Sequence, residues 1–259
     1  MTDEKIRLGG MALSNGVLVH GPTAWACAIR TDDGVLKVAS GHKRFPASRI
    51  ANPLLRGPAR LAEAFALLPI LRRRLPEARL PFERPAVVAT MLASAVVARG
   101  VKESDRIGPA AKELVGGFLA LVPATLSLRG STLAEYHGAE HMSIGAYEHG
   151  AVRPREHERC GSHLVGPLLG ASALGAALAA RAPERLRLPA RLAASIGAVA
   201  ASTEIFGWMT RNPDNRLSRA LARPGHELQH RLATAEPGPD QLEVAEAALA
   251  ACLRLENEH

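Results

Sequence analysis

The chain has 259 residues, of which 47% are hydrophobic but only 3% aromatic, and it carries a net charge of +7. This length allows one large domain or two small ones. A basic chain favours nucleic acid, anionic lipid or acidic ligands as partners. The basic residues are mostly scattered arginines, with one cluster at residues 72–74, and aromatic residues do not interleave with them. A nucleic-acid groove is therefore not expected.

Residues 8–40 predict a small antiparallel sheet. Two short β-prone runs, at residues 17–19 and 25–29, are followed by the hairpin signal Asp32-Asp33-Gly34 and a returning run at 35–38. We expect a β-rich amino-terminal segment over residues 1–45. The first ten residues are polar and charged, so no signal peptide is expected.

From residue 50 the hydrophobic pattern becomes helical, and it is broken at Pro76 and Pro81. Spanning a membrane takes about 20 apolar residues. Four Ala- and Gly-rich stretches follow, two of which approach that length, and their composition suits close helix packing. Hydropathy alone supports membrane-spanning helices and the buried helices of a soluble bundle equally. The four stretches are residues 86–98, 113–128, 164–180 and 192–209.

The expected fold class is mainly α, a bundle of about four apolar helices with the small β segment in front of it. The bundle is expected over residues 46–212, and carboxy-terminal amphipathic helices over 213–259. Residues 215–233 indicate an arginine-rich helix broken at Pro224-Gly225, and residues 240–255 a closing helix.

Five of the ten histidines fall within residues 137–163. Thr132 and Glu135 predict a capping box and Gly150 a stop, which bound a helix of some four turns. On that helix His137 and His141 share one face with Glu140, the H-x-x-E-H spacing of inverted zinc proteases. Two imidazoles at this spacing reach one ion, and the carboxylate can hold or deprotonate a bound water.

Further candidate ligands follow the two histidines. Glu148 lies two turns beyond His141, and the chain then returns at His157 and Cys160, with Ser162 as a helix cap. A third ligand from a following loop is a normal way to close a metal site. His149 and His163 are expected to lie outside the ligand set. The alternative is a polar, hydrogen-bonded loop at a membrane surface or helix junction, without metal.

A second histidine pattern occurs near the carboxy terminus. His226, Glu227 and His230 have the H-E-x-x-H spacing of zincins. Arg231 follows directly, Pro224-Gly225 precedes, and the surrounding helix is arginine-rich. We therefore expect a solvated helix start and keep the pattern as a weak alternative metal site.

Five segments carry a resemblance to a known family: GGMALSNGVLVHGPTAWACAIRTDDG, NPLLRGPARLAEA, YHGAEHMSIGAYEHG, HERCGS and AEPGPDQLEVAEAAL. They resemble the YqhQ-like bacterial membrane proteins, a family of unknown function described as candidate metal-dependent enzymes. The resemblance implies an integral protein of the bacterial inner membrane. It also implies that the family's motif positions correspond here to His137, Glu140, His141, Glu148, His157, Arg159 and Cys160.

The resemblance has departures. The family usually has other residues at Met11, Asn15, His20 and Met142. Asn15 stands where the family has a glutamate; if that glutamate takes part in activity, this chain lacks it. The family tail also lacks histidines at positions 226 and 230. Tyr136 and Arg159 are expected to support the ligands rather than bind the metal.

Together these observations predict a membrane-embedded metal-dependent hydrolase with its site on the cytoplasmic side. A divalent metal, zinc first, is held by His137 and His141 with His157, Cys160 or Glu148, and Glu140 is the catalytic base. The expected substrate is an unidentified small molecule, lipid or peptide. The sequence is also compatible with a homo-oligomer. One alternative is a non-catalytic membrane adaptor with a structural metal site and a basic partner-binding surface. A soluble helical metalloprotein is a further one.

Overall fold

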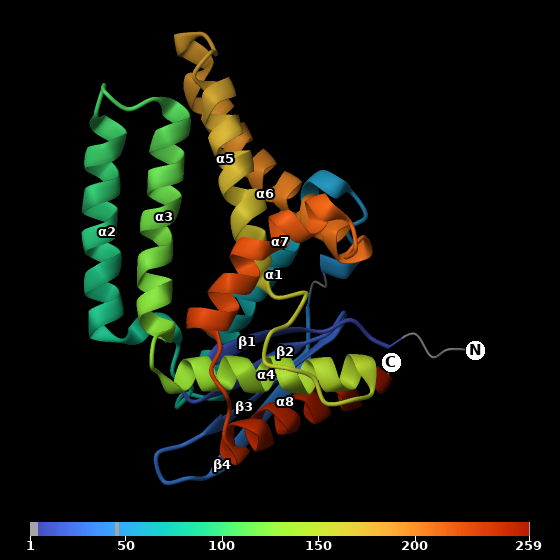
Figure 1. The fold of residues 1–259 in the computed structure, drawn as a ribbon. Coiled ribbons are helices and arrows are strands. Elements are labelled where there is room, and N and C mark those ends of the chain that lie inside the picture. Colours follow the sequence, from blue (N-terminus) through green and yellow to red (C-terminus); the bar gives the residue numbers. More distant parts are fainter. Residues whose placement is uncertain (1–4, 45–46, 259) are drawn as a thin grey trace.

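The computed structural model describes residues 5–44 and 47–258 (Figure 1). Four strands form an antiparallel sheet in chain order: β1 (Gly9–Leu13), β2 (Gly16–His20), β3 (Ala24–Arg30) and β4 (Leu36–His42). Gly34 makes the turn between β3 and β4 with φ of 79°, a left-handed conformation that glycine adopts without strain. The predicted amino-terminal sheet is confirmed.

Eight α-helices follow in the described part of the chain. Their bounds are α1 (Pro53–Arg74), α2 (Pro85–Glu103), α3 (Pro109–Leu128), α4 (Thr132–His149), α5 (Val165–Ala179), α6 (Arg187–Arg211), α7 (Arg216–Leu228) and α8 (Pro239–Asn257). A short 3-10 turn, η3 (Gly161–Leu164), precedes α5, and a π-helical turn, η5 (Gln229–Ala233), follows α7.

Helices cover both faces of the sheet, because alternate side chains along each strand point to opposite faces. Val17 and Val19 of β2 pack with α4 and α8 in one hydrophobic cluster. Leu18, between them, joins a second cluster with Leu67 and Leu71 of α1. The sheet is thus the centre of a three-layer unit, with α4 and α8 below it in Figure 1 and α1 above it.

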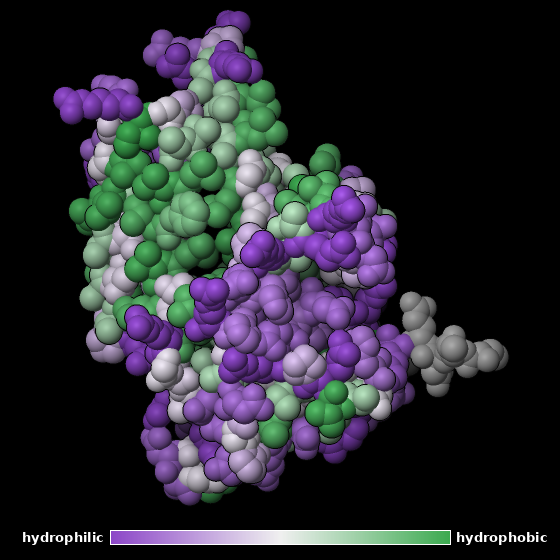
Figure 2. Space-filling model, viewed as in Figure 1, coloured by the Kyte–Doolittle hydropathy of each residue, from purple (hydrophilic) through white to green (hydrophobic). Residues whose placement is uncertain are grey.

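The remaining long helices form the apolar part of the molecule. Four helices are long and apolar enough to cross a membrane: Pro85–Glu103, Pro109–Leu128, Gly161–Ala179 and Glu184–Arg211. Only 6% to 22% of their apolar windows is buried inside the protein. Figure 2 shows the resulting hydrophobic surface over α2, α3 and α5. A soluble bundle would bury these faces, so the arrangement is compatible with a membrane protein. The mainly α fold class with about four apolar helices is confirmed.

Two local expectations differ from the structure. The capping box at Thr132 is wrong: Ser131 is the N-cap without a side-chain bond, and the Thr132 hydroxyl donates to the Ser14 carbonyl at 3.0 Å. α7 runs uninterrupted through Pro224-Gly225. A Cβ on Gly225 would lie 2.7 Å from backbone atoms of His163, so this glycine permits close packing of α7 on η3 rather than ending the helix.

One helix within the residue range expected for the bundle packs on the sheet. α4 lies against the sheet together with α8. Its apolar residues, including Leu133 and Ile144, extend the core of the sheet. α4 therefore contributes its hydrophobic face to the β layer.

Candidate metal centre

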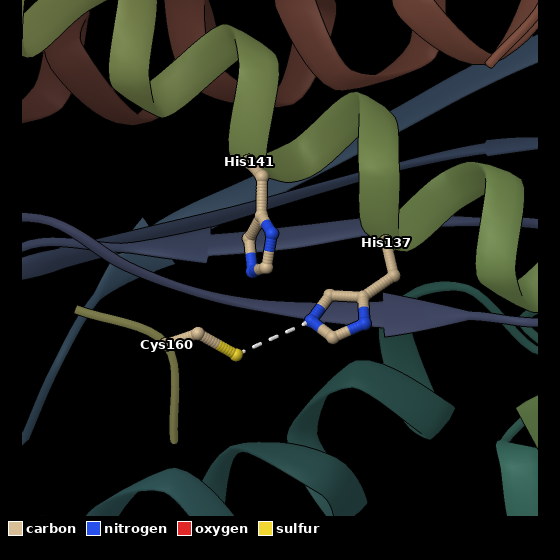
Figure 3. Close-up of side chains that lie close together, drawn as sticks. All are labelled: His137, His141 and Cys160. Atoms are coloured by element: carbon tan, nitrogen blue, oxygen red, sulfur yellow. Dashed lines mark hydrogen bonds between the residues drawn. The ribbon is translucent and has the colours of Figure 1, made fainter. Parts of the chain in front are cut away.

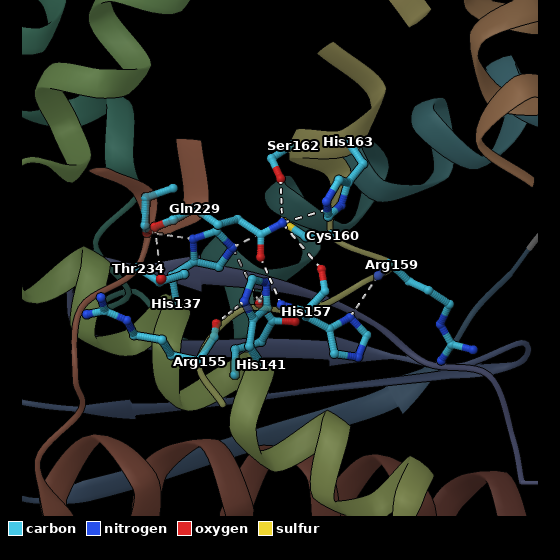
Figure 4. A network of polar contacts seen from close by, with 12 residues as sticks. His137, His141, Arg155, His157, Arg159, Cys160, Ser162, His163, Gln229 and Thr234 are labelled. Carbon is cyan, nitrogen blue, oxygen red and sulfur yellow. Dashed lines mark hydrogen bonds and ion pairs between the residues drawn. The ribbon is translucent and has the colours of Figure 1, made fainter. Parts of the chain in front are cut away.

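α4 presents two chemically different faces, and this orients the candidate ligands. Leu133, Tyr136 and Ala139 point into the hydrophobic cluster with the sheet and α8. His137 and His141 project from the other side of the helix. They face the returning loop before η3 and the segment after α7, as Figure 3 and Figure 4 show. Gly150 ends the helix with φ of 70°, as predicted, and lets the chain turn back.

His137, His141 and Cys160 converge on one point (Figure 3). One ligand atom from each residue lies within 4.8 Å of those of the other two, and the Cys160 Sγ is 3.6 Å from His137 Nε2. His141 is 2% exposed, whereas His137 and Cys160 are partly buried. Of the loop residues expected as a third ligand, Cys160 is the one that lies next to the two helical imidazoles.

Both imidazole rings are held by the backbone through their other nitrogen. His137 Nδ1 donates to the Ala233 carbonyl at 2.8 Å, and His141 Nδ1 donates to the Arg155 carbonyl at 2.6 Å. A carbonyl oxygen only accepts, so the ring proton is on Nδ1 in both residues and each Nε2 is left as an acceptor, that of His137 toward the Cys160 thiol. Metal-binding histidines usually have such a partner, which fixes their tautomer and orientation.

One donor spacing has the value expected around zinc. Zinc–sulfur bonds of about 2.3 Å and zinc–nitrogen bonds of about 2.0–2.1 Å at a tetrahedral angle separate sulfur from nitrogen by about 3.6 Å. The Cys160 Sγ–His137 Nε2 distance of 3.6 Å has this value, which is also that of a thiol–imidazole hydrogen bond, and the three donor atoms together lie within 4.8 Å of one another. Burial lowers the pKa of His141, which keeps that ring neutral and able to bind, and burial raises the pKa of the Cys160 thiol. A bound cation would reverse the second effect by favouring the thiolate.

Glu140 lies beside the cluster. Its Oε2 is 3.9 Å from His137 Nε2 and 3.8 Å from His141 Nε2, and the residue is 6% exposed. Burial raises the pKa of its carboxyl to about 7, with His137 acting in the opposite direction. A Cβ on Gly10 of β1 would lie 2.2 Å from Glu140 Oε1, so the glycine leaves the space that this side chain occupies.

Glu148, His157 and Arg159 form a second group next to the first. His157 Nε2 lies 3.2 Å from Glu148 Oε2, and the same carboxylate pairs with Arg159. The ring centroid of His157 is 5.5 Å from that of His141. Two of the predicted ligands, His157 and Glu148, are therefore bound to each other, beside the converging three rather than among them.

The comparison with known families bears on this region. Residues 118–255, just over half of the chain, match the family DUF1385, described as a protein of unknown function. The chain belongs to the DUF1385 family. No curated protein and no solved structure matches it. The matched range contains α4, Cys160 and the carbonyls of Arg155 and Ala233, so the whole cluster lies within the DUF1385 region.

The structure adds a residue of the DUF1385 region that the sequence did not single out. Gln229 is fully buried, accepts from the His157 amide at 2.8 Å, and donates to Ser162 Oγ at 2.8 Å and to the His157 carbonyl at 3.3 Å (Figure 4). Gln229, the first residue of η5, therefore holds His157 and Ser162, the residues on either side of Cys160. Ser162 is predicted to cap a helix, but its hydroxyl accepts a hydrogen bond from Gln229. Gln229 lies inside the H-E-x-x-H pattern, but only the two histidines and the glutamate of that pattern point to a site in the sequence.

The histidines of that pattern do not converge on a third ligand among the described residues. The rings of His226 and His230 stack with centroids 6.4 Å apart, and His230 Nδ1 pairs with Glu156 at 2.9 Å. Glu227 pairs with Arg231 at 2.9 Å, one turn along the chain. These contacts are those of a partly solvated helix end.

The remaining candidates lie away from the cluster. The Tyr136 side chain is buried in the hydrophobic core. Asn15 bonds through its side chain to the Arg30 and Glu77 carbonyls and to the Arg79 amide. These bonds stabilise the turn between β1 and β2, so Asn15 has a role in the fold. His149 is exposed, whereas His163 is buried beside Gln229.

Gly138→Ala tests how tightly α4 is held against the ligand-bearing segment. A Cβ here would lie 2.2 Å from the Ala235 carbonyl oxygen, a backbone atom that cannot yield without moving Ala233 and its bond to His137. We expect destabilisation of about 1–3 kcal/mol, as for other overpacked sites, and weaker metal binding. Gly100→Ala is the control, because this helical glycine has open space around its Cβ position and the change should be neutral or stabilising. Equal thermal stability of the two variants would contradict the packing described.

Proposed function

We propose that this protein is a membrane-embedded, zinc-dependent hydrolase in which His137, His141 and Cys160 hold the metal and Glu140 is the base. The observation that carries the proposal is the convergence of two unprotonated Nε2 atoms and a thiol, with both Nδ1 atoms held by backbone carbonyls. Such orientation of imidazoles toward a shared point is typical of metal sites. The resemblance to the YqhQ-like proteins agrees with this assignment.

The membrane assignment rests on the four apolar helices and their exposed faces. We infer that they span the inner membrane of a bacterium. We propose that the end carrying the sheet and α4 lies in the cytoplasm. Basic residues flank the spans at both ends, among them Arg84 and Arg129 at this end and Arg106 and Arg185 at the other, so the positive-inside rule does not select this side.

The chemistry follows from a three-donor set. Three protein ligands leave one tetrahedral position open, and a zinc ion in such a site acts as a Lewis acid that makes water acidic near neutral pH. Glu140 Oε2 lies 3.8 and 3.9 Å from the two Nε2 atoms, so its carboxylate is beside the converging donors. In the enzyme, Oε2 would take a proton from the attacking water and return it to the leaving group.

One observation favours a second candidate, a non-catalytic adaptor with a structural metal site. Glu140 and His141 are 6% and 2% exposed, and closed, buried sites are usual for structural zinc. In that case Glu140 would be the fourth ligand. The basic surface around the site would then serve to bind a partner. The two candidates differ in what Glu140 does.

Glu140→Gln separates them. For the enzyme, hydrolysis of chromogenic ester and phosphodiester probes by the purified protein should fall about 10²–10⁴-fold, the range of a general base, while zinc per chain stays unchanged. Glu135→Gln, on the same helix one turn earlier, is the control and should retain both. Zinc loss on Glu140→Gln would favour the structural site, and full hydrolysis with zinc retained would refute the assigned base.

A further inference from the structure

A cavity of about 800 Å³ opens next to the candidate metal centre. It lies between the end of α4 with its following loop and the adjacent ends of α6 and α7. His157 and Glu148 line it, and the His157 ring is 5.5 Å from the ring of His141. The cavity is therefore separated from the metal ligands by one layer of side chains.

The charge of the cavity is unbalanced. Six lysine and arginine side chains line it against three carboxylates, and each carboxylate is already engaged by a basic partner. Arg7, Arg219 and Arg223 remain, and no ion pair within the described residues involves them. Three unpaired guanidinium groups around one cavity fit an anion, and guanidinium binds phosphate oxygens in a bidentate manner.

One wall of the cavity is apolar and belongs to a candidate membrane span. Phe206 and Met209, from the last turns of α6, line it. α7 follows directly, with Arg219 and Arg223 toward the cavity and Leu217 59% exposed. A basic, amphipathic helix of this kind lies at the level of lipid headgroups. The cavity thus has positively charged arginines on one side and an apolar wall on the other, and it lies where the α6 span ends.

We propose that this cavity binds the phosphate headgroup of an anionic phospholipid. The arginines hold the phosphate, and the α6 wall accommodates the proximal part of the acyl chains. His157 and Glu148 lie between the headgroup and the metal ligands.

The test compares two double variants of the full chain in detergent, each removing two positive charges. Arg219→Gln with Arg223→Gln alters the cavity, whereas Arg211→Gln with Arg216→Gln alters exposed arginines on the same helices outside it. Binding of phosphatidylglycerol and phosphatidylcholine is titrated by native mass spectrometry, and zinc per chain is measured on the same samples. We expect the cavity variant to bind phosphatidylglycerol about 30-fold more weakly, from about 1 kcal/mol per basic residue. The other variant should stay near wild type.

Further arms identify the ligand. Inorganic phosphate at millimolar concentration should not displace phosphatidylglycerol, and phosphatidylcholine should bind more weakly than it. Equal losses in both double variants, or unchanged binding in both, would overturn the cavity assignment. Displacement by phosphate would overturn the lipid in favour of a soluble phosphate compound. His137→Ala should lose zinc but keep phosphatidylglycerol, so that failure of the metal assignment is seen separately from failure of the lipid site.

Discussion

Replacing His141 with alanine should lower the affinity for zinc by more than about 100-fold, beyond the 10–100-fold effect of losing an outer partner of a ligand. The ring supplies one of the three converging donor atoms and is 2% exposed, so no side chain from solvent replaces it. Zinc per purified chain, measured by mass spectrometry of the metal, should fall from about one to near zero. Chelation should lower the melting temperature of the wild type and leave that of the variant unchanged, because metal binding adds to folding stability.

His149→Ala is the matched control for this change. His149 lies on the same helix but is exposed and outside the cluster. It should bind as much zinc as the wild type. Equal zinc in both variants would show that the converging residues are not a metal site, and equal loss in both would point to a general effect on α4.

Replacing Gln229 with leucine should destabilise the protein although the residue does not bind the metal. The change leaves the His157 amide and the Ser162 hydroxyl without their partner, whereas the His157 carbonyl keeps the Cys160 amide. An unpaired buried polar group costs about 1–3 kcal/mol, so we expect a loss of about 2 kcal/mol or more. For a chain of this size that lowers the melting temperature by about 4–8 °C. Zinc affinity should fall about 10–100-fold, because the same bonds hold the loop that carries Cys160.

Gln241→Leu is the control for the glutamine change. Gln241 is partly exposed at the start of α8, where its side chain accepts from the Gly238 amide and donates to Glu135. It should cost about 1 kcal/mol, as for a helix cap, and leave zinc affinity unaltered. A Gln229 variant as stable as this control would mean that the buried network does not hold the loop.

The local part of this site follows from the sequence alone. Helical periodicity places His137, Glu140 and His141 on one face, and Gly150 ends the helix, because both depend on residues within a few turns. The same holds for the apolar helices, whose length and composition are local properties. The strands at residues 17–19, 25–29 and 35–38 and the turn at Gly34 follow from short β-prone runs and turn residues, whereas β1 is not assigned from the sequence.

The sequence alone does not decide which loop residue lies next to the two histidines. Cys160 and His157 are separated by three positions, and both are competent ligands by type. The choice depends on the path of the loop, which Gln229 sets from about 70 residues away. No periodicity links these two segments. The Gly9-Gly10 pair gave a partial signal, since a strand glycine often marks a close approach, but its neighbour, Glu140, is known only once the sheet and α4 have packed.

X-ray absorption at the zinc edge of the purified wild-type protein tests the metal centre most directly. The account predicts one zinc per chain with two nitrogen neighbours at about 2.0–2.1 Å and one sulfur at about 2.3 Å, completed by oxygen. Protein without stoichiometric metal, or a metal surrounded by oxygen and nitrogen with no sulfur, would contradict it.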